Sequence, residues 1–177
     1  MLDREAGRPA PAAVKGLLSI GMPAYNRPEE LRRMLSISVS QTYTNTEIIV
    51  ADDASPNPLV REVAAEFASH DPRIRSYRQE MNHGVLGNAE FVLKEAKGEY
   101  FTWFSEDDWR TAEFISKLAG ELEKNKGVDF AFCDYREVLP DGSYAPGYPA
   151  THLGVFRPFT NRHRLVRTLS YYLQNAA

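Results

Sequence analysis

The sequence predicts an α/β fold of three layers, with helices on both sides of a mostly parallel central sheet. Short apolar runs rich in β-branched residues, such as residues 48–51, are typical of strands buried on both faces of a parallel sheet. These runs alternate along the chain with amphipathic helical patterns, and right-handed βαβ crossovers place such helices on both faces of a sheet. Ligands of such folds bind outside the carboxyl ends of the strands.

The first half of the chain begins with residues 1–15, a Pro- and Ala-rich head expected to be disordered. Residues 17–22 form an apolar strand that Pro23 is expected to end, because proline cannot donate to a sheet. A helix is expected at residues 29–41, with a proline in its first turn, acidic residues at its positive end and apolar residues four positions apart. A strand at 48–51, a helix at 59–67 and a short strand at 73–78 follow.

The second half continues the alternation. A helix at residues 88–97 ends at Gly98, and the apolar run at 100–104 predicts the next strand. Residues 143–158 contain mainly glycine, proline and scattered aromatic residues, which indicates a loop. The other expected elements are a helix at 114–122, a strand at 128–133 and a last helix at 161–174.

Length and composition narrow the class of protein. A chain of 177 residues with 43% hydrophobic content is expected to form one domain, over residues 16–177. Its net charge of -3 provides no broad basic surface, so nucleic acid is not an expected partner. The single cysteine, Cys133, excludes an intramolecular disulfide. With no secretory or membrane-spanning run, we expect a cytoplasmic protein, with a peripheral position at the inner face of a membrane as an option.

Carboxylates follow two of the expected strands at their carboxyl ends. They are Asp52 and Asp53 after the first, and Glu106, Asp107 and Asp108 after the second. Adjacent carboxylates repel one another unless a cation lies among them, and hard divalent ions prefer oxygen ligands. A solvated acidic loop would explain one such group, but two groups at the ligand edge of a sheet indicate a metal or a ligand that carries one.

Four short motifs occur in a fixed order between residues 17 and 135. They are Ser-Ile-Gly-Met-Pro-Ala-Tyr-Asn-Arg at 19–27, the run at 48–55, Asn-His-Gly at 82–84 with Asn88, and Gly-Glu-Tyr at 98–100 before the acidic run at 106–108. In order and spacing they resemble family 2 glycosyltransferases. The resemblance implies a Rossmann-like GT-A fold that binds a nucleotide-diphosphate-sugar donor, inversion at the anomeric carbon, and a divalent metal, Mn²⁺ or Mg²⁺.

The resemblance also implies roles for single residues. Asp107 matches the last Asp of the family's Asp-x-Asp motif and is the expected metal ligand, supported by Glu106 or Asp108. Ser105 occupies the first position of that motif, a departure that weakens metal binding without excluding it, because Mg²⁺ readily keeps several waters. The expected donor-binding residues are Pro23, Tyr25, Asn26, Arg27, Asp52, Asp53, Gly84, Asn88, Glu106 and Asp107, and the expected metal ligands are Asp107 and Asp108.

Several of these residues have a second interpretation. Asp52 and Asp53 could accept hydrogen bonds from a nucleobase or ribose, or could cap the helix at 59–67. Tyr25 could cover the base or pack in the core, and Arg27 could approach the diphosphate or lie in solvent. Gly84 is expected to adopt a positive φ.

The expected activity is transfer of a sugar to a glycan or lipid-linked acceptor, as in polysaccharide biosynthesis. Such transfer needs a general base close to the acceptor hydroxyl, which the family supplies after the segment that ends here at residue 177. The later carboxylates are Asp129, Asp134, Glu137 and Asp141, and none matches that position. We therefore expect donor binding without the acceptor part. A non-catalytic or truncated nucleotide-sugar-binding module is the alternative.

Two other classes fit less well. A receiver domain needs a lysine at the end of a later strand, where this chain has Cys133 and Asp134. A dinucleotide-binding Rossmann domain needs a G-x-G-x-x-G loop after its first strand, where this chain has Met22 and Pro23.

Overall fold

A computed structural model describes residues 13–106, 108–125, 127–133, 139, 142–143 and 153–156. The chain divides into two compact units, Met1–Ser116 and Lys117–Ala177, and the division falls within helix α4 (Phe114–Lys124). The expected organisation as one domain stays a prediction.

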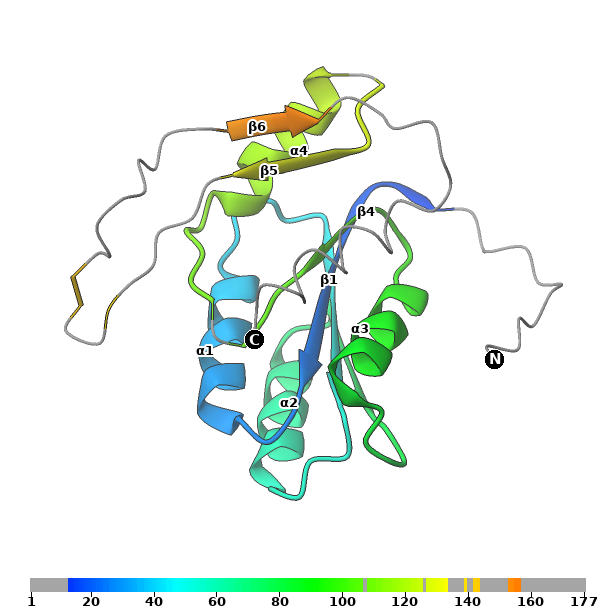
Figure 1. Cartoon of the computed structure of the whole chain (residues 1–177), viewed down its shortest axis with the longest axis vertical. Helices are drawn as coiled ribbons and strands as arrows, with labels where there is room; N and C mark the ends of the chain where they lie inside the picture. Colours follow the sequence, from blue (N-terminus) through cyan, green and yellow to red (C-terminus); the bar gives the residue numbers. More distant parts are fainter. Residues whose placement is uncertain are drawn as a thin grey trace, which may run out of the picture. The chain divides into compact units, whose positions relative to one another are not determined.

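The first unit contains a four-stranded sheet with the strand order β3-β2-β1-β4 (Figure 1). All three pairs of neighbouring strands are parallel, which confirms the α/β class and the parallel sheet. Its elements are β1 (Val14–Ala24), α1 (Pro28–Val39), β2 (Thr46–Asp52), α2 (Leu59–His70), β3 (Ile74–Arg78), α3 (Gly84–Lys94) and β4 (Gly98–Trp103).

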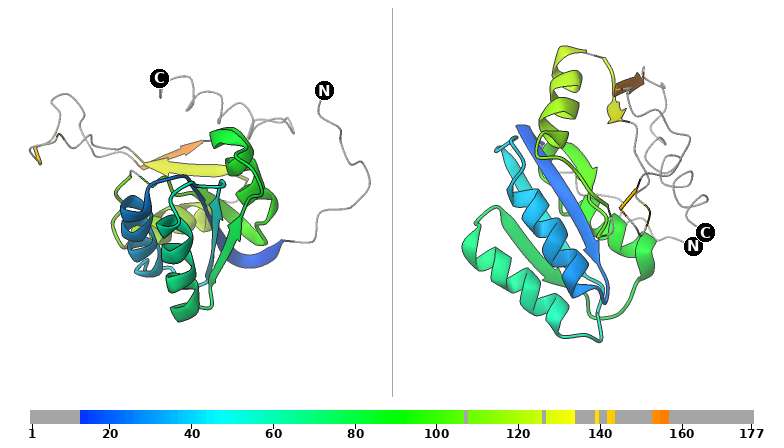
Figure 2. Two further views of the ribbon diagram at one scale, coloured as in Figure 1. Left: turned by 90° about the horizontal axis from the view of Figure 1, so that it is seen from below. Right: turned by 90° about the vertical axis from the view of Figure 1, so that its left-hand side faces the viewer.

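Strand β2 shows why the fold has three layers. All its residues are buried, and alternate side chains point to opposite faces of the sheet. Ile48 and Val50 belong to the larger core with α1 and α2, whereas Ile49 and Ala51 pack with Val92 of α3. Figure 2 shows α1 and α2 on one face of the sheet and α3 on the other.

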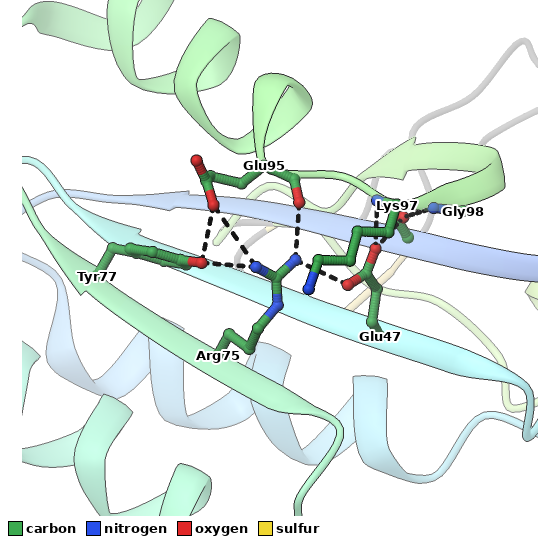
Figure 3. Close-up of polar contacts among 7 residues, drawn as sticks. Glu47, Arg75, Tyr77, Glu95, Lys97 and Gly98 are labelled. Carbon is green, nitrogen blue, oxygen red and sulfur yellow. Dashed lines mark hydrogen bonds and ion pairs between the residues drawn. The ribbon is translucent and has the colours of Figure 1, made fainter. Parts of the chain in front are cut away.

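A polar cluster joins the end of α3 to strands β2 and β3 (Figure 3). The Glu47 carboxylate accepts hydrogen bonds from Arg75 at 2.7 Å and from the Lys97 amide at 2.6 Å. Arg75 also donates to the Glu95 carbonyl at 2.7 Å, and the Tyr77 hydroxyl donates to the Glu95 carboxylate at 2.8 Å. Because β2, β3 and the segment after α3 all take part, the cluster holds the end of α3 against the sheet.

Strand β1 is longer than predicted at both ends. It begins at Val14, so the last two residues of the expected disordered head belong to the sheet, and it continues through Pro23. The Gly21 carbonyl faces β4 and accepts a hydrogen bond from the Phe104 amide at 2.9 Å, and pairing with β4 ends at Trp103. Since alternate residues face the same neighbour, the nitrogen of Pro23 faces β4 just beyond this pairing, where no ladder donor is needed.

Two other predictions differ from the structure. Helix α3 begins at Gly84, four residues earlier than expected. The predicted loop at 143–158 is wrong in part, because it contains strand β6 (Leu153–Phe156), which pairs antiparallel with β5 (Phe130–Cys133). The four-residue length of β6 and its partner 20 residues away leave little local signal in the sequence.

The expected helix at 161–174 lies outside the described residues. In the described part of the chain, no helix has the length and apolar character needed to cross a membrane.

Candidate functional site

The four parallel strands bring their carboxyl ends to one edge of the sheet. The segments that follow them are residues 25–27 after β1, 53–58 after β2, 79–83 after β3 and 104–113 after β4. The described site residues in these segments therefore lie at the same edge, as expected for an open α/β sheet.

Asp52 is held by the chain through both of its carboxylate oxygens. Its Oδ1 accepts a hydrogen bond from the Ser55 amide at 2.9 Å, and its Oδ2 pairs with the guanidinium of Arg78. The residue is only 1% exposed. The first amide of helix α2, that of Leu59, donates to the Asn57 side chain at 3.0 Å, whereas the acidic pair accepts from the Ser55 and His83 amides, so the alternative that this pair caps the helix is wrong.

Asp53 is buried as deeply but has fewer partners. Its Oδ1 accepts a hydrogen bond from the His83 amide at 2.8 Å. Within the described residues, its Oδ2 has no hydrogen-bond partner. This oxygen is not among the fully buried side-chain atoms that lack a partner, so it reaches the surface of the site, where a ligand donor could bond to it.

Two backbone amides after β1 bond to the neighbouring segments. The Tyr25 amide donates to the Glu106 carboxylate at 2.9 Å, and the Asn26 amide donates to the Ser55 hydroxyl at 2.9 Å. The Tyr25 residue is 46% exposed, so the alternative that it packs in the core is wrong. Its ring is thus available at the site edge. Arg27 is also exposed there.

Gly84 and Asn88 shape the entry to α3. Gly84 has φ of 74°, which confirms the predicted positive value. Asn88 is buried, and its amide donates to the Ala51 carbonyl at 2.8 Å, just before the acidic pair. Asn88 therefore supports the end of β2 from beneath rather than facing solvent.

The acidic segment after β4 is braced by arginines. The Asp108 carboxylate pairs with Arg110 at 2.9 Å, and the Arg110 guanidinium carbon lies 4.3 Å from the centre of the Phe104 ring. Arg33 of α1 donates to the Glu106 carbonyl at 3.1 Å. The ion pair with Arg110 neutralises part of the charge that led to the prediction of a metal.

The predicted metal ligands are only partly described. Asp107 lies outside the described residues. The Asp108 side chain is 52% exposed, and its carboxylate offers the hard oxygen atoms that suit Mg²⁺ or Mn²⁺. Across the described residues, no group of three or more potential ligands is close enough to bind a metal. The donor chemistry therefore fits a divalent cation, but the described residues alone do not complete its site.

Sequence reasoning missed Arg78, Ser55, Arg33 and Arg110. Arg78 could have been found, because it is the last residue of a predicted strand and so belongs to the ligand edge. The other contacts join segments distant in the chain, for which a single sequence has no signal. Of the carboxylates considered for a general base, Asp134, Glu137 and Asp141 lie outside the described residues.

Comparison with known proteins identifies the class to which this fold and site belong. The model of glycosyl transferase family 2 matches residues 19–175, so the chain belongs to this family, which confirms the resemblance. Chondroitin synthase of Pasteurella multocida is 29% identical over 133 residues, which are 75% of this chain and 14% of that protein. Glycosyltransferase GlyA of Streptococcus pneumoniae is 33% identical over 118 residues, 67% of this chain and 16% of that protein.

Solved structures show the same fold. A mannosyltransferase from Pyrobaculum calidifontis, in complex with GDP-Man and Mn²⁺, superimposes with a TM-score of 0.60 at 18% identity, over 73% of this chain and 39% of that one. TarS of S. aureus, in complex with UDP, gives a TM-score of 0.55 at 23% identity, over 60% of this chain and 32% of that one. The predicted GT-A fold is thereby confirmed. The chain spans between 13% and 48% of the length of the curated relatives it matches.

Proposed function

We propose that this chain is the donor-binding part of an inverting, metal-dependent glycosyltransferase, which moves a sugar from a nucleotide-diphosphate-sugar to a glycan or lipid-linked acceptor. Membership of glycosyl transferase family 2 supports the reaction class. Relatives named chondroitin synthase and hyaluronan synthase support a role in polysaccharide assembly. A non-catalytic nucleotide-sugar-binding module would need the same donor site, so both candidates share the binding step tested below.

The observation that carries the proposal is the open oxygen of Asp53. This carboxylate is 2% exposed, and only its Oδ1 is bonded within the described residues. A nucleobase N–H or a ribose hydroxyl would supply the missing donor to Oδ2. Asp52, whose oxygens are already engaged by Ser55 and Arg78, is less suited to this contact.

Neighbouring groups suit the rest of such a ligand. The exposed ring of Tyr25 could cover a base, and the exposed Arg27 follows two residues later towards the α1 amino terminus. Asp107 and Asp108 would hold the divalent cation, which, when bound, would neutralise the diphosphate leaving group. The inversion at the anomeric carbon, the sugar and the acceptor are part of the proposal and rest on the family.

Titration calorimetry of the wild type and Asp53→Asn tests the proposal with UDP, GDP and dTDP in the presence of Mn²⁺. Loss of a charged hydrogen-bond acceptor costs about 1.5–3 kcal/mol, which is roughly a tenfold to hundredfold rise in Kd. We expect this loss for the nucleotide that the wild type binds best, and little change for pyrophosphate.

Asp71→Asn is the matched control. Asp71 pairs with Arg73 at 2.6 Å at the opposite end of β3, so the same chemical change there should leave nucleotide binding intact. If no nucleotide binds to the wild type, the donor-site proposal is wrong. If a nucleotide does bind, an assay for transfer or hydrolysis of the corresponding nucleotide sugar by the wild type separates an enzyme from a binding module.

A further inference from the structure

Arg78 forms an ion pair with a buried carboxylate, that of Asp52, at the edge of the candidate site. It is the last residue of β3, and its guanidinium contacts the Asp52 carboxylate and donates to the Ser55 carbonyl at 3.1 Å. The Asp52 side chain is 2% exposed and that of Arg78 is 40% exposed. Arg78 therefore spans from solvent to a charge that would be costly to bury alone.

The contacts of Arg78 continue to the segment after β1. Asp52 accepts a hydrogen bond from the Ser55 amide, and the Ser55 hydroxyl accepts one from the Asn26 amide, both at 2.9 Å. The segments after β1, β2 and β3 are thus joined in one hydrogen-bonded chain. Arg78 is its only cation among the described residues.

Two residues of these hydrogen-bonded segments have backbone conformations that are unfavourable by themselves. Asn26 has φ of 61° and Ala54 has φ of 56°, both in the left-handed region that costs side-chain-bearing residues free energy. Ala54 lies between the two residues that Arg78 contacts, and Asn26 donates to Ser55. Such conformations persist where the surroundings hold them, and they are common at ligand-binding sites.

We propose that Arg78 and Asp52 act as one unit that holds the segments after β1 and β2 in the shape required by the nucleotide. Arg78 is a positioning residue in this scheme, because it acts through Asp52 and Ser55. Asp53 and Tyr25, which follow the strands so joined, are the groups held in place. The inference rests on the proposed nucleotide site and adds a residue that binds the protein rather than the ligand.

The test is a double-mutant cycle of Arg78→Met and Asp52→Asn, with Kd measured for UDP and GDP in the presence of Mn²⁺. Each single variant should raise Kd by about tenfold or more, the size seen when a partner that supports a binding residue is lost. Because the two residues act as a unit, the double variant should lose no more than the worse single variant. Arg78→Lys keeps the charge without the planar fork and should give an intermediate Kd.

Arg73→Met is the matched control. Arg73 forms an ion pair with Asp71 at 2.6 Å near the other end of β3 and donates to the Val39 carbonyl, so its loss should lower stability without changing Kd. If Arg78→Met does not fold, the double variant and Arg78→Lys carry the test, because neither leaves the Asp52 charge without a cation.

Amide hydrogen exchange gives a readout that does not depend on a ligand. The Ser55 and Asn26 amides should be protected in the wild type, should exchange faster in Arg78→Met, and should stay protected in Arg73→Met. Unchanged exchange in Arg78→Met, or losses of affinity that multiply in the double variant, would overturn the inference. Absence of UDP and GDP binding in the wild type would refute the proposed function, while the exchange data would still decide whether Arg78 holds these segments.

Discussion

At the residue scale, Ala54 has an unusual backbone conformation within the candidate site. Its φ of 56° lies in the left-handed region, between two residues that Arg78 contacts. A β-branched side chain tolerates this region less well than alanine, so Ala54→Val should lower the free energy of unfolding by about 1–3 kcal/mol. Urea denaturation would measure the change. Ala54→Gly should be neutral or stabilising, and equal losses for both variants would contradict the role of φ.

At the same scale, arginines supply part of the positive charge for which the sequence predicted a divalent metal ion. Asp52 pairs with Arg78, and Asp108 pairs with Arg110. Clustered carboxylates of this chain therefore do pair with positive charge, but part of that charge comes from the protein. This leaves Asp53 and the exposed part of Asp108 as the described carboxylates best placed for a ligand.

At the scale of elements, Gly21 permits the close approach of β1, β4 and α3. A Cβ atom there would lie 2.6 Å from the Phe101 ring and 2.8 Å from a Val92 methyl. Gly21→Ala should therefore lower the free energy of unfolding by about 1–3 kcal/mol, measured by urea denaturation. Gly120→Ala in α4 is the control, because a Cβ there meets nothing within 4 Å, and a stabilisation of up to about 1 kcal/mol is expected. Equal effects would show that packing at Gly21 is not limiting.

The polar cluster beneath α3 makes stability depend on pH. Burial alone would raise the pKa of Glu47, but hydrogen bonds from Ser19, the Lys97 amide and Arg75 outweigh it, so this pKa lies below the ordinary value of 4.5. The unfolded chain then binds the proton more tightly, and Glu47 contributes stability above pH 4.5 that is lost as pH falls through the lower folded value.

Urea denaturation between pH 3 and pH 7 should show this loss in the wild type, and a shallower pH dependence in Glu47→Gln. Glu62→Gln makes the same chemical change at an exposed position of α2 and should leave the pH dependence unchanged. Identical profiles for wild type and Glu47→Gln would assign the acid sensitivity to other groups.

The elements that the sequence predicted well are those with a strong local pattern. The buried run around Ile48 and the amphipathic spacing in α1 and α2 specify both type and position. The extension of β1 through Pro23 could not be predicted, because it depends on where the neighbouring strand β4 ends. Asp52 and Asp53 were found as a pair, but their division into a held and an open carboxylate depends on Arg78 and His83, which lie on another strand end and its loop.

At the scale of the whole molecule, the two ends of the sheet in the first unit differ in what their polar contacts stabilise. The contacts of Glu47, Arg75 and Glu95 lie at the amino-terminal half of the strands and join α3 to the sheet. The contacts of Arg78 and Glu106 lie at the carboxyl ends and order the segments of the candidate site. Variants in the first group should therefore change stability more than affinity, and variants in the second group the reverse.

The negative charge of the molecule leads to a last prediction: binding of a ligand with phosphates should require a divalent metal, and binding of a ligand without phosphates should not. The chain has a net charge of -3, and carboxylates follow β2 and β4 at the edge of the sheet where we propose that a diphosphate binds. Replacing Mn²⁺ by EDTA should weaken UDP binding by about tenfold or more, since close charge interactions at a protein surface exceed the 1.4 kcal/mol that this factor represents. Uridine has no phosphate, so calorimetry should give it the same affinity in both buffers.

Asp107→Ala should abolish the metal-dependent part of UDP binding, whereas Asp71→Ala, at the opposite edge of the sheet, should retain it. Equal affinity of the wild type for UDP in Mn²⁺ and in EDTA would show that arginines alone neutralise the diphosphate, and Arg27 would then be the first residue to replace.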